Sequence, residues 1–249
     1  MNRSDPFDGI LLVDKPAGPT SHDLVDKIRR HFNLKKVGHG GTLDPAATGL
    51  LIILLGRGTR LSAKFMSSDK TYEGTMRLGI TTDSQDADGQ VIREADPSGV
   101  SLEQLQAEMA KFRGDLYQTP PMVSAIKIGG VPLYKMARRG QEVERQPRLI
   151  HLYEMRLLNF TPPRASFVLR CTKGTYVRTI CHDIGEALGC GAHLEQLRRT
   201  ESGELNVNRA IPLDKLLALQ QVQLLDLVIP MHTFAGSSTL PPGSGQSPP

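Results

Sequence analysis

The chain has 249 residues and a mass of 27.3 kDa, which is the size of one large domain or two small ones. Hydrophobic residues make up 39% and charged residues 22%, enough for a packed core, and this composition excludes wholesale disorder. Lys and Arg number 30 against 26 Asp and Glu, so the formal net charge of +4 is informative only through its distribution.

Membrane insertion, secretion and a disulfide framework are all disfavoured. No apolar run approaches the ~20 residues that span a bilayer. The N-terminal residues lack a charged region followed by a long apolar stretch, so we expect no secretory signal. The three cysteines are an odd number without close pairing, which fits a reducing compartment. We therefore expect a cytoplasmic protein with no membrane partner.

The predicted strands and helices follow one another without strict alternation, which favours an α+β fold. Strands are expected at residues 9–13, 50–55, 72–78 and 165–171. Helices are expected after a cap at Thr20 or Ser21, after a capping box at Ser101 and Gln104, from residue 177 to a stop at Gly189, and over residues 213–228. Residues 82–89 resemble an acidic turn, and residues 114–146 a long irregular functional loop.

Positive charge gathers in two stretches of the chain. Between Lys27 and Lys64 eight basic residues accompany a single acid, Asp44. A second stretch holds six basic residues against Glu142 and Glu144, namely Lys127, Lys135, Arg138, Arg139, Arg145 and Arg148. Clustered positive charge interspersed with glycine suits a phosphate backbone, although a solvated basic surface explains either stretch equally well. The low aromatic content, 5% with no Trp, argues against a broad base-stacking platform.

Residues 38–49, GHGGTLDPAATG, form the most informative segment. Its four glycines allow close approach of the backbone to a bulky ligand, and Pro45 fixes a turn after Asp44. The result is a carboxylate on a constrained loop amid positive charge, which favours the ionised form that a nucleophile or base requires. On composition alone, an ordinary Asp-Pro turn is the more probable interpretation.

Other motifs do not support a cofactor or a metal. The glycines of residues 38–41 do not complete a dinucleotide fingerprint, and no phosphate-binding P-loop is present. The acidic run ending at Gly89 fails the calcium-loop pattern, because Ser84 and Ala95 would occupy its first and last ligand positions. The Cys and His residues between 181 and 193 match no common zinc spacing, and buried apolar cysteines are expected instead.

Five further segments, in order along the chain, resemble the TruB family of pseudouridine synthases together with the Asp44 loop. They are GILLVDKP near the start, SDKTYEG around Tyr72, SAIKIGGVPLYKMARRG in the second basic stretch, KGTYVRTI around Arg178 and GCGAHLEQLRRT around Leu197. The resemblance runs from about residue 8 to about residue 231. It implies the pseudouridine synthase fold, a mixed and mostly antiparallel central sheet flanked by helices with a basic loop insertion.

The resemblance also implies an activity and a set of site residues. The family isomerises a uridine of the tRNA T-loop, at position 55, to pseudouridine, and consumes no cofactor or metal. Asp44 would be the nucleophile, by attack on carbon-6 of the base, by attack on the ribose, or by deprotonation to a glycal. Arg178 would pair with Asp44 and aim it. The substrate-binding set would be His39, Tyr72, Tyr176, Arg178 and Leu197, with Lys15 and Pro16 shaping the pocket floor.

By this resemblance residues 8–231 form the catalytic domain, with an RNA-clamping insertion at about 114–148. The tail at 235–249 is rich in Gly, Ser and Pro and is expected to be disordered, and no C-terminal RNA-binding domain of the PUA type is expected after it. The expected partner is the T-stem-loop of tRNA, bound by a monomer without an obligatory protein partner. Neutralising Arg138 and Arg139 should weaken tRNA binding.

Two other functions remain open. One is an RNA-binding or tRNA-folding protein whose catalysis is dispensable. The other is a hydrolase with Asp44 and a second carboxylate, such as Asp14, as a pair, although nothing in the sequence brings those two together.

Overall fold

One sheet of eleven strands runs through the computed structural model, which describes residues 5–124, 126–137 and 139–234. Its main path follows the order β14 (Ile211–Pro212), β1 (Gly9–Lys15), β3 (Thr48–Leu55), β12 (Ala192–Ser202), β4 (Lys70–Leu78), β11 (Arg164–Cys171), β10 (Arg148–Thr161) and β7 (Gly114–Gln118). Side strands are β2 (Val37–His39), β13 (Leu205–Asn206) and β15 (Ile229–Pro230). Only the β1–β14 and β12–β3 pairs are parallel. The expected mixed, mostly antiparallel α+β sheet is confirmed.

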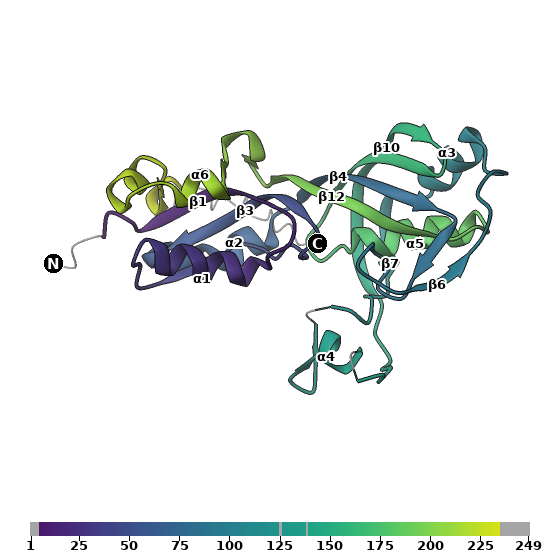
Figure 1. Ribbon diagram of the computed structural model, residues 1–249, viewed down its shortest axis with the longest axis horizontal. Helices are drawn as coiled ribbons and strands as arrows, with labels where there is room; N and C mark the ends of the chain where they lie inside the picture. Colours follow the sequence, from purple (N-terminus) through teal and green to yellow (C-terminus); the bar gives the residue numbers. More distant parts are fainter. Residues whose placement is uncertain (1–4, 125, 138, 235–249) are drawn as a thin grey trace, which may run out of the picture.

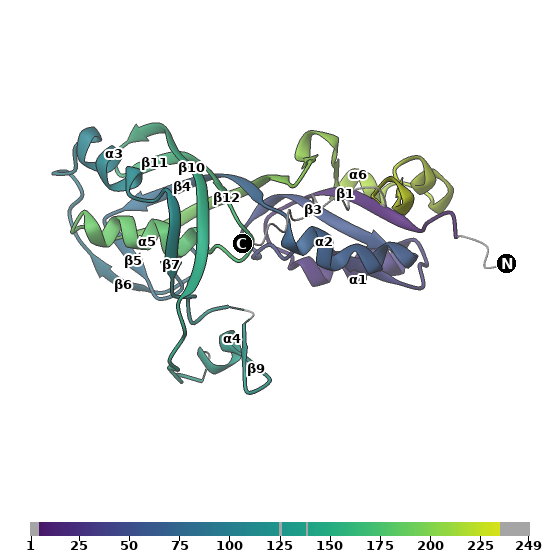
Figure 2. The same ribbon diagram turned by 180° about the vertical axis from the view of Figure 1, so that it is seen from behind.

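Helices cover the sheet in each of two halves, and an insertion projects from the second half (Figures 1 and 2). The first half carries α1 (Ser21–His31), α2 (Ser62–Ser67) and α6 (Leu213–Leu217), and the second carries α3 (Leu102–Ala110) and α5 (Val177–Ala187). Within the insertion lie α4 (Leu133–Ala137) and the hairpin of β8 (Lys127–Ile128) and β9 (Val131–Pro132). A second hairpin joins β5 (Ile80–Thr82) to β6 (Val91–Glu94). Short 3-10 turns are η1 (Gly56–Leu61), η2 (Val207–Arg209), η3 (Gln221–Asp226) and η4 (Met231–Phe234).

None of the helices in the described ranges combines the length and the apolar character that crossing a bilayer requires.

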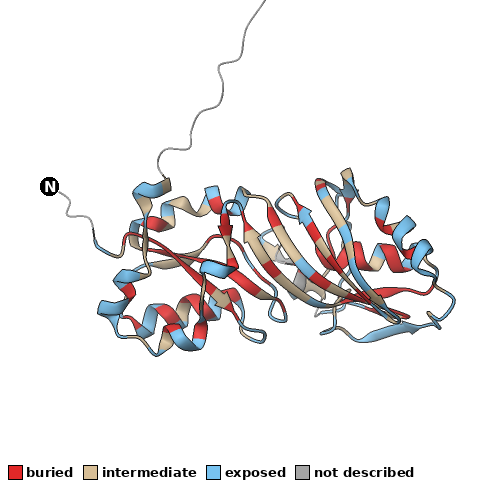
Figure 3. Ribbon diagram, turned by 90° about the horizontal axis from the view of Figure 1, so that it is seen from above, coloured by how far each residue is buried: buried red, intermediate tan, exposed pale blue. Residues whose placement is uncertain are grey.

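From residue 50 onward strand β3 is apolar, because both of its faces are buried. Leu50, Ile52 and Leu54 pack with Phe65 of α2 on one side. Leu51, Ile53 and Leu55 pack on the other side, where α1 contributes the stripe of Leu24, Val25, Ile28 and Phe32. Figure 3 shows the buried residues concentrated in the strands and on the inward faces of the helices. Burial on two faces explains why residues 50–55 form a continuous hydrophobic run instead of an alternating one.

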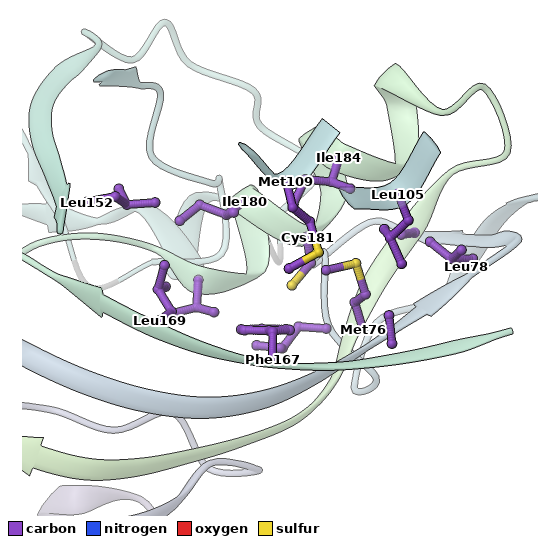
Figure 4. Close-up of a cluster of buried hydrophobic side chains, with 14 of the residues drawn as sticks. Met76, Leu78, Leu105, Met109, Leu152, Phe167, Leu169, Ile180, Cys181 and Ile184 are labelled. Atoms are coloured by element: carbon purple, nitrogen blue, oxygen red, sulfur yellow. The ribbon is translucent and has the colours of Figure 1, made fainter. Parts of the chain in front are cut away.

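In the second half a single face of the sheet is buried, beneath α3 and α5 (Figure 4). Met76, Phe167 and Leu169 of the strands contact a helical layer that includes Leu105 and Ile180. The three cysteines, Cys171, Cys181 and Cys190, are free and buried, as the sequence predicts.

The helix boundaries follow their caps. The N–H of Asp23 donates to Thr20 Oγ1 at 3.1 Å and the N–H of Thr20 donates to Asp23 Oδ2 at 2.8 Å, which completes a capping box. Ser101 and Gln104 form the second box as predicted. Gly189 adopts a φ of 80° just after α5, the left-handed conformation that ends helices.

Two sequence expectations are wrong in detail, and one strand is missing from the predicted elements. Residues 114–118 form the edge strand β7, because Leu116 packs on the core while Asp115 and Tyr117 face out. Strand β10 was not predicted at all, since register shifts at Leu152 and Leu157 interrupt its alternation. The helix expected over 213–228 ends at Leu217, and Gln220 then caps the separate turn η3.

The two halves of the sheet join at a seam of two residue pairs. Arg198 lies opposite Thr48 and Arg199 opposite Gly49, in parallel register. Gly49 has a φ of 98°, and a Cβ there would lie 2.3 Å from the carbonyl oxygen of Arg199. Only glycine satisfies both conditions at this position.

Gly49→Ala should therefore lower the free energy of unfolding by at least about 2 kcal/mol, with a fall in Tm of roughly 4–8 °C. Denaturant and thermal unfolding measure the change. Gly99→Ala is the matched control, because a Cβ at Gly99 meets nothing within 4 Å, and it should change stability by less than about 0.5 kcal/mol. Equal effects of the two substitutions would show that the seam is not tightly packed.

Candidate active site

The loop of residues 40–47 connects β2 to β3 and carries Asp44. A buried lysine of β1 holds this loop in place. The Lys15 ammonium donates to three carbonyl oxygens, those of Pro16, Pro45 and Ala47, at 2.9, 2.8 and 2.7 Å. Burial lowers the pKa of Lys15 to about 8. Lys15 therefore fixes the loop from outside the cavity beside Asp44. Lys15 and Pro16 line a different cavity, together with Asp14, so the expectation that they shape the pocket floor is wrong.

A serine of α1 holds the same loop from the side. Ser21 Oγ accepts a hydrogen bond from the Leu43 N–H at 2.9 Å and donates to the Leu43 carbonyl at 3.1 Å. These bonds satisfy both backbone groups of the residue before Asp44. The position of the Asp44 backbone is thus set by long-range contacts as well as by Pro45.

Arg199 holds the loop from the sheet. Its side chain is buried, and its guanidinium donates to three carbonyl oxygens, those of Leu50, Thr42 and Gly41, at 2.8, 3.2 and 3.2 Å. Carbonyls on both sides of Asp44 in the chain are therefore tied to a single rigid group.

Arg178 lies between two carboxylates. Its Nη2 is 3.5 Å from Asp44 Oδ2, and its Nη1 is 3.0 Å from Asp86 Oδ2. Nη2 also donates to the Val123 carbonyl at 2.7 Å. The Arg178 side chain is 5% exposed and that of Asp44 is 49% exposed, so a fixed cation holds a carboxylate that remains accessible.

A cavity of about 320 Å³ opens beside Asp44 at the junction of the two halves. Its walls come from the loop, from β4, β12 and the start of α5, and include Asp44, Tyr72, Tyr176, Arg178 and Leu197. The structure thus brings together five of the six predicted site residues. A half-apolar cleft with a few convergent polar groups is the usual form of a small-ligand site.

The two tyrosines are neutral phenols. Enclosure raises the pKa of Tyr72 to about 12, and burial likewise raises the pKa of Tyr176. The Arg178 guanidinium lies 5.7 Å from the centre of the Tyr176 ring, within the range of a cation–π contact. Aromatic faces and the Leu197 side chain together offer surfaces on which a planar ring could stack.

Two further sequence-predicted residues lie outside the cavity. His39 belongs to β2 and does not line the cavity; its Nδ1 accepts a hydrogen bond from the Gly41 N–H at 3.4 Å, and burial lowers its pKa. Asp14, the candidate second carboxylate of a hydrolase, binds Arg198 through two hydrogen bonds of 2.9 and 2.7 Å and lines a different cavity. The structure does not support the Asp14–Asp44 pair.

Three charged residues of this region were missed: Asp86, Lys70 and Arg199. Strand periodicity contained a signal for two of them. Lys70 precedes Tyr72 by two residues and Arg199 follows Leu197 by two, so each shares a face with a predicted site residue. Both indeed line the cavity. Asp86 lies in the acidic turn, and no local pattern connects it with Arg178.

Comparison with known proteins gives the same assignment along almost the whole chain. The TruB family pseudouridylate synthase N-terminal domain matches residues 29–177, and the tRNA pseudouridylate synthase B C-terminal domain matches residues 178–234. A tRNA pseudouridine synthase B from Opitutus terrae is 53% identical over 231 residues, which cover 93% of this chain and 96% of that protein. One from Syntrophotalea carbinolica is 50% identical over 210 residues, 84% of this chain and 69% of that protein.

Solved structures agree with the family matches. The crystal structure of a Cbf5-Nop10-Gar1 complex contains a chain that superposes with a TM-score of 0.68 at 32% identity, over 86% of this chain and 54% of that one. A structure of an H/ACA RNP bound to a substrate RNA superposes with a TM-score of 0.64 at 29% identity, over 86% and 53% of the two chains. With two family domains matched end to end and a relative more than half identical, the chain belongs to the TruB family of pseudouridine synthases.

Proposed function

We propose that this chain isomerises a uridine in the T-loop of tRNA, at position 55, to pseudouridine, with Asp44 as the nucleophile. One observation carries the proposal: in a chain of this family, an accessible carboxylate lies 3.5 Å from a buried guanidinium at the mouth of a cavity lined by tyrosine and leucine. Asp44 acts on the flipped nucleotide, and Arg178 holds the carboxylate in position. The face of Tyr72 stacks on the uracil, while Tyr176 and Leu197 border it.

The target nucleotide has to leave the T-loop stack before it can enter the cavity. Extrusion costs a few kcal/mol, and stacking and hydrogen bonds in the pocket offset part of this cost. The fixed loop supports this step, because Lys15, Ser21 and Arg199 hold its backbone before any RNA binds. Preorganisation of this kind leaves binding energy available for the nucleotide. The role of His39 is proposed to be positioning of the loop through the Gly41 N–H.

The proposal is tested by incubating the purified protein with an unmodified tRNA transcript and mapping pseudouridine at single-nucleotide resolution. Conversion of the T-loop uridine at position 55, and of no other uridine, is the expected result. Binding of the transcript without any product would instead favour the RNA-binding or tRNA-folding function. Release of free uracil would favour a hydrolase.

The insertion is proposed to clamp the RNA. Lys135 and Arg139 are exposed on it, while Arg145 is tied down by a hydrogen bond of 3.1 Å to the Pro120 carbonyl. Arg138 lies outside the described residues. Phosphate contacts from such a segment position a structured RNA and carry little sequence information.

Replacing Arg138 and Arg139 by glutamine should weaken tRNA binding and flatten its salt dependence. Each lost phosphate contact reduces the slope of log K against log salt by about 1. Binding titrations from 50 to 200 mM salt measure this slope. Arg93→Gln is the control, because Arg93 pairs with Glu186 in the second half of the molecule. An unchanged affinity and an unchanged salt slope in the double variant would show that these two arginines do not bind the RNA phosphates.

We also infer a monomer that needs no protein partner and works in the cytoplasm. The free, buried cysteines suit a reducing compartment.

A further inference from the structure

The cavity is lined by more positive than negative charge. Lys70, Arg178 and Arg199 contribute cations, and Asp44 contributes the one carboxylate among the described lining residues. The second nearby carboxylate, Asp86, is bound to Arg178 at 3.0 Å. Both carboxylates therefore pair with Arg178. The positive charges of Lys70 and Arg199 are left without a carboxylate partner.

Lys70 begins β4 and is 6% exposed. Its ammonium donates to backbone carbonyls at the end of α2, those of Phe65 and Met66 at 3.1 and 3.0 Å and that of Ser68. These acceptors fix the charge in place without neutralising it.

Arg199 is 2% exposed and lies directly opposite Tyr72 in the β12–β4 pairing. The two cations flank the same point of the Asp44 loop. A Cβ on Gly41 would lie 3.6 Å from Arg199 Nη1 and 4.0 Å from Lys70 Cε. Lys70, Arg199 and Tyr72 thus form one contiguous part of the cavity lining, called here the floor.

Within the described ranges, neither cation has a carboxylate within 4.0 Å. Two buried charges without a counterion are costly, and their carbonyl bonds compensate only part of the lost hydration. Such charges become favourable when negative charge develops in the cavity. Fixed cations in an enclosed site stabilise a developing anion strongly.

We propose that Lys70 and Arg199 form a cationic floor that stabilises the uracil as an anion while it is detached from the ribose. This inference rests on the proposed isomerisation. When the bond between ribose carbon-1′ and uracil N1 breaks heterolytically, its electron pair stays on the uracil and spreads over the ring and its two carbonyl oxygens. The electron-deficient sugar is compensated by Asp44, either by attack or by removal of a proton. The anion then reattaches through carbon-5 to carbon-1′, as the bond from Asp44 to carbon-1′ breaks or as the abstracted proton returns to the glycal. The proton on carbon-5 is then lost and N1 gains a proton, which restores the neutral aromatic base.

The charge of Lys70 is itself titratable, which gives a readout that a structural role would not produce. Burial lowers the pKa of Lys70 to about 8. Arg199 and Lys173 act in the same direction, and Asp69 opposes them. The neighbouring Cys171 remains a neutral thiol, because burial raises its pKa to about 12. Lys70 should therefore be charged at pH 6.5 and mostly neutral at pH 9.5.

The experiment measures single-turnover isomerisation and tRNA binding for Lys70→Met, which removes the charge and the donors, and Lys70→Gln, which keeps donors without charge. At pH 6.5 both variants should lose at least about 10-fold in rate while the Kd for tRNA stays within about twofold. The ratio of wild-type to variant rate should then fall toward one at pH 9.5. Lys64→Met is the control, because Lys64 is exposed on α2 and bonds the Phe234 carbonyl outside the cavity.

Three results would contradict the proposal that Lys70 and Arg199 stabilise the uracil anion. These are a variant rate within twofold of wild type at pH 6.5, a loss that is the same at both pH values, and a loss that appears in tRNA affinity instead of rate. A wild-type protein that makes no pseudouridine would contradict the proposed function itself. An active wild type with unaffected Lys70 variants would contradict only the cationic floor. Thermal unfolding of each variant confirms that the comparison is made on folded protein.

Discussion

Asp44→Asn should abolish pseudouridine formation, with a loss of at least about 10⁴-fold in single-turnover rate, because an amide is neither a nucleophile nor a base. The fold should survive. The Asp44 side chain is half-exposed, and Arg178 keeps its bonds to Asp86 and to the Val123 carbonyl after the substitution. The measurement is pseudouridine formation at saturating tRNA, together with a binding titration.

Affinity for tRNA should stay within a few-fold of wild type, since the clamp and the cavity walls are untouched. Asp88→Asn is the matched control: Asp88 is an exposed carboxylate in the same acidic turn as Asp86, and its loss should leave the rate within twofold. An Asp44→Asn variant with more than a few percent of wild-type activity would exclude this carboxylate as the reacting group.

Arg178→Gln should have the second largest effect, a fall in rate of about 10²- to 10³-fold with a loss of stability. Without the guanidinium the Asp44 carboxylate is no longer held in its position. A displacement of about 1 Å in a reacting group lowers a rate by about 10²-fold. The substitution also leaves Asp86, whose side chain is 16% exposed, without its cation, at a cost of up to about 3 kcal/mol. Single-turnover kinetics and denaturant unfolding measure the two losses.

The double variant Arg178→Gln/Asp86→Asn separates the two roles of the arginine. Removing the orphaned carboxylate should restore much of the stability, because no unpaired buried charge remains. The rate should stay low, because no guanidinium holds the Asp44 carboxylate in position. Recovery of both stability and rate would show that Arg178 only maintains the fold.

The parts of the fold that could be predicted are those whose physical cause is local. The cap at Thr20 and the Ser101 capping box depend on neighbours in the chain, and the apolar run of residues 50–55 is visible in the sequence itself; all three were confirmed. The edge strand at 114–118 and the bulged β10 depend on pairing with distant strands. Short or interrupted alternation is therefore weak evidence until the partner strand is known.

The site could be predicted only as far as the family resemblance reached. Asp44, Tyr72, Tyr176, Arg178 and Leu197 were named in this way and do line one cavity, although their roles remain predictions. Arg199 was missed because an arginine in a strand is normally a surface charge. It is buried here only because the carbonyls of Gly41, Thr42 and Leu50, about 150 residues earlier in the chain, accept its hydrogen bonds.

The most direct test of the account is a crystal structure of the Asp44→Asn variant bound to an unmodified T-stem-loop. We expect the target uridine outside the loop stack, with its base against Tyr72 and Leu197 and its ribose next to residue 44. A uridine still stacked in the RNA, or seated at a surface away from Arg178, would contradict the central claim that this cavity receives the reacting nucleotide.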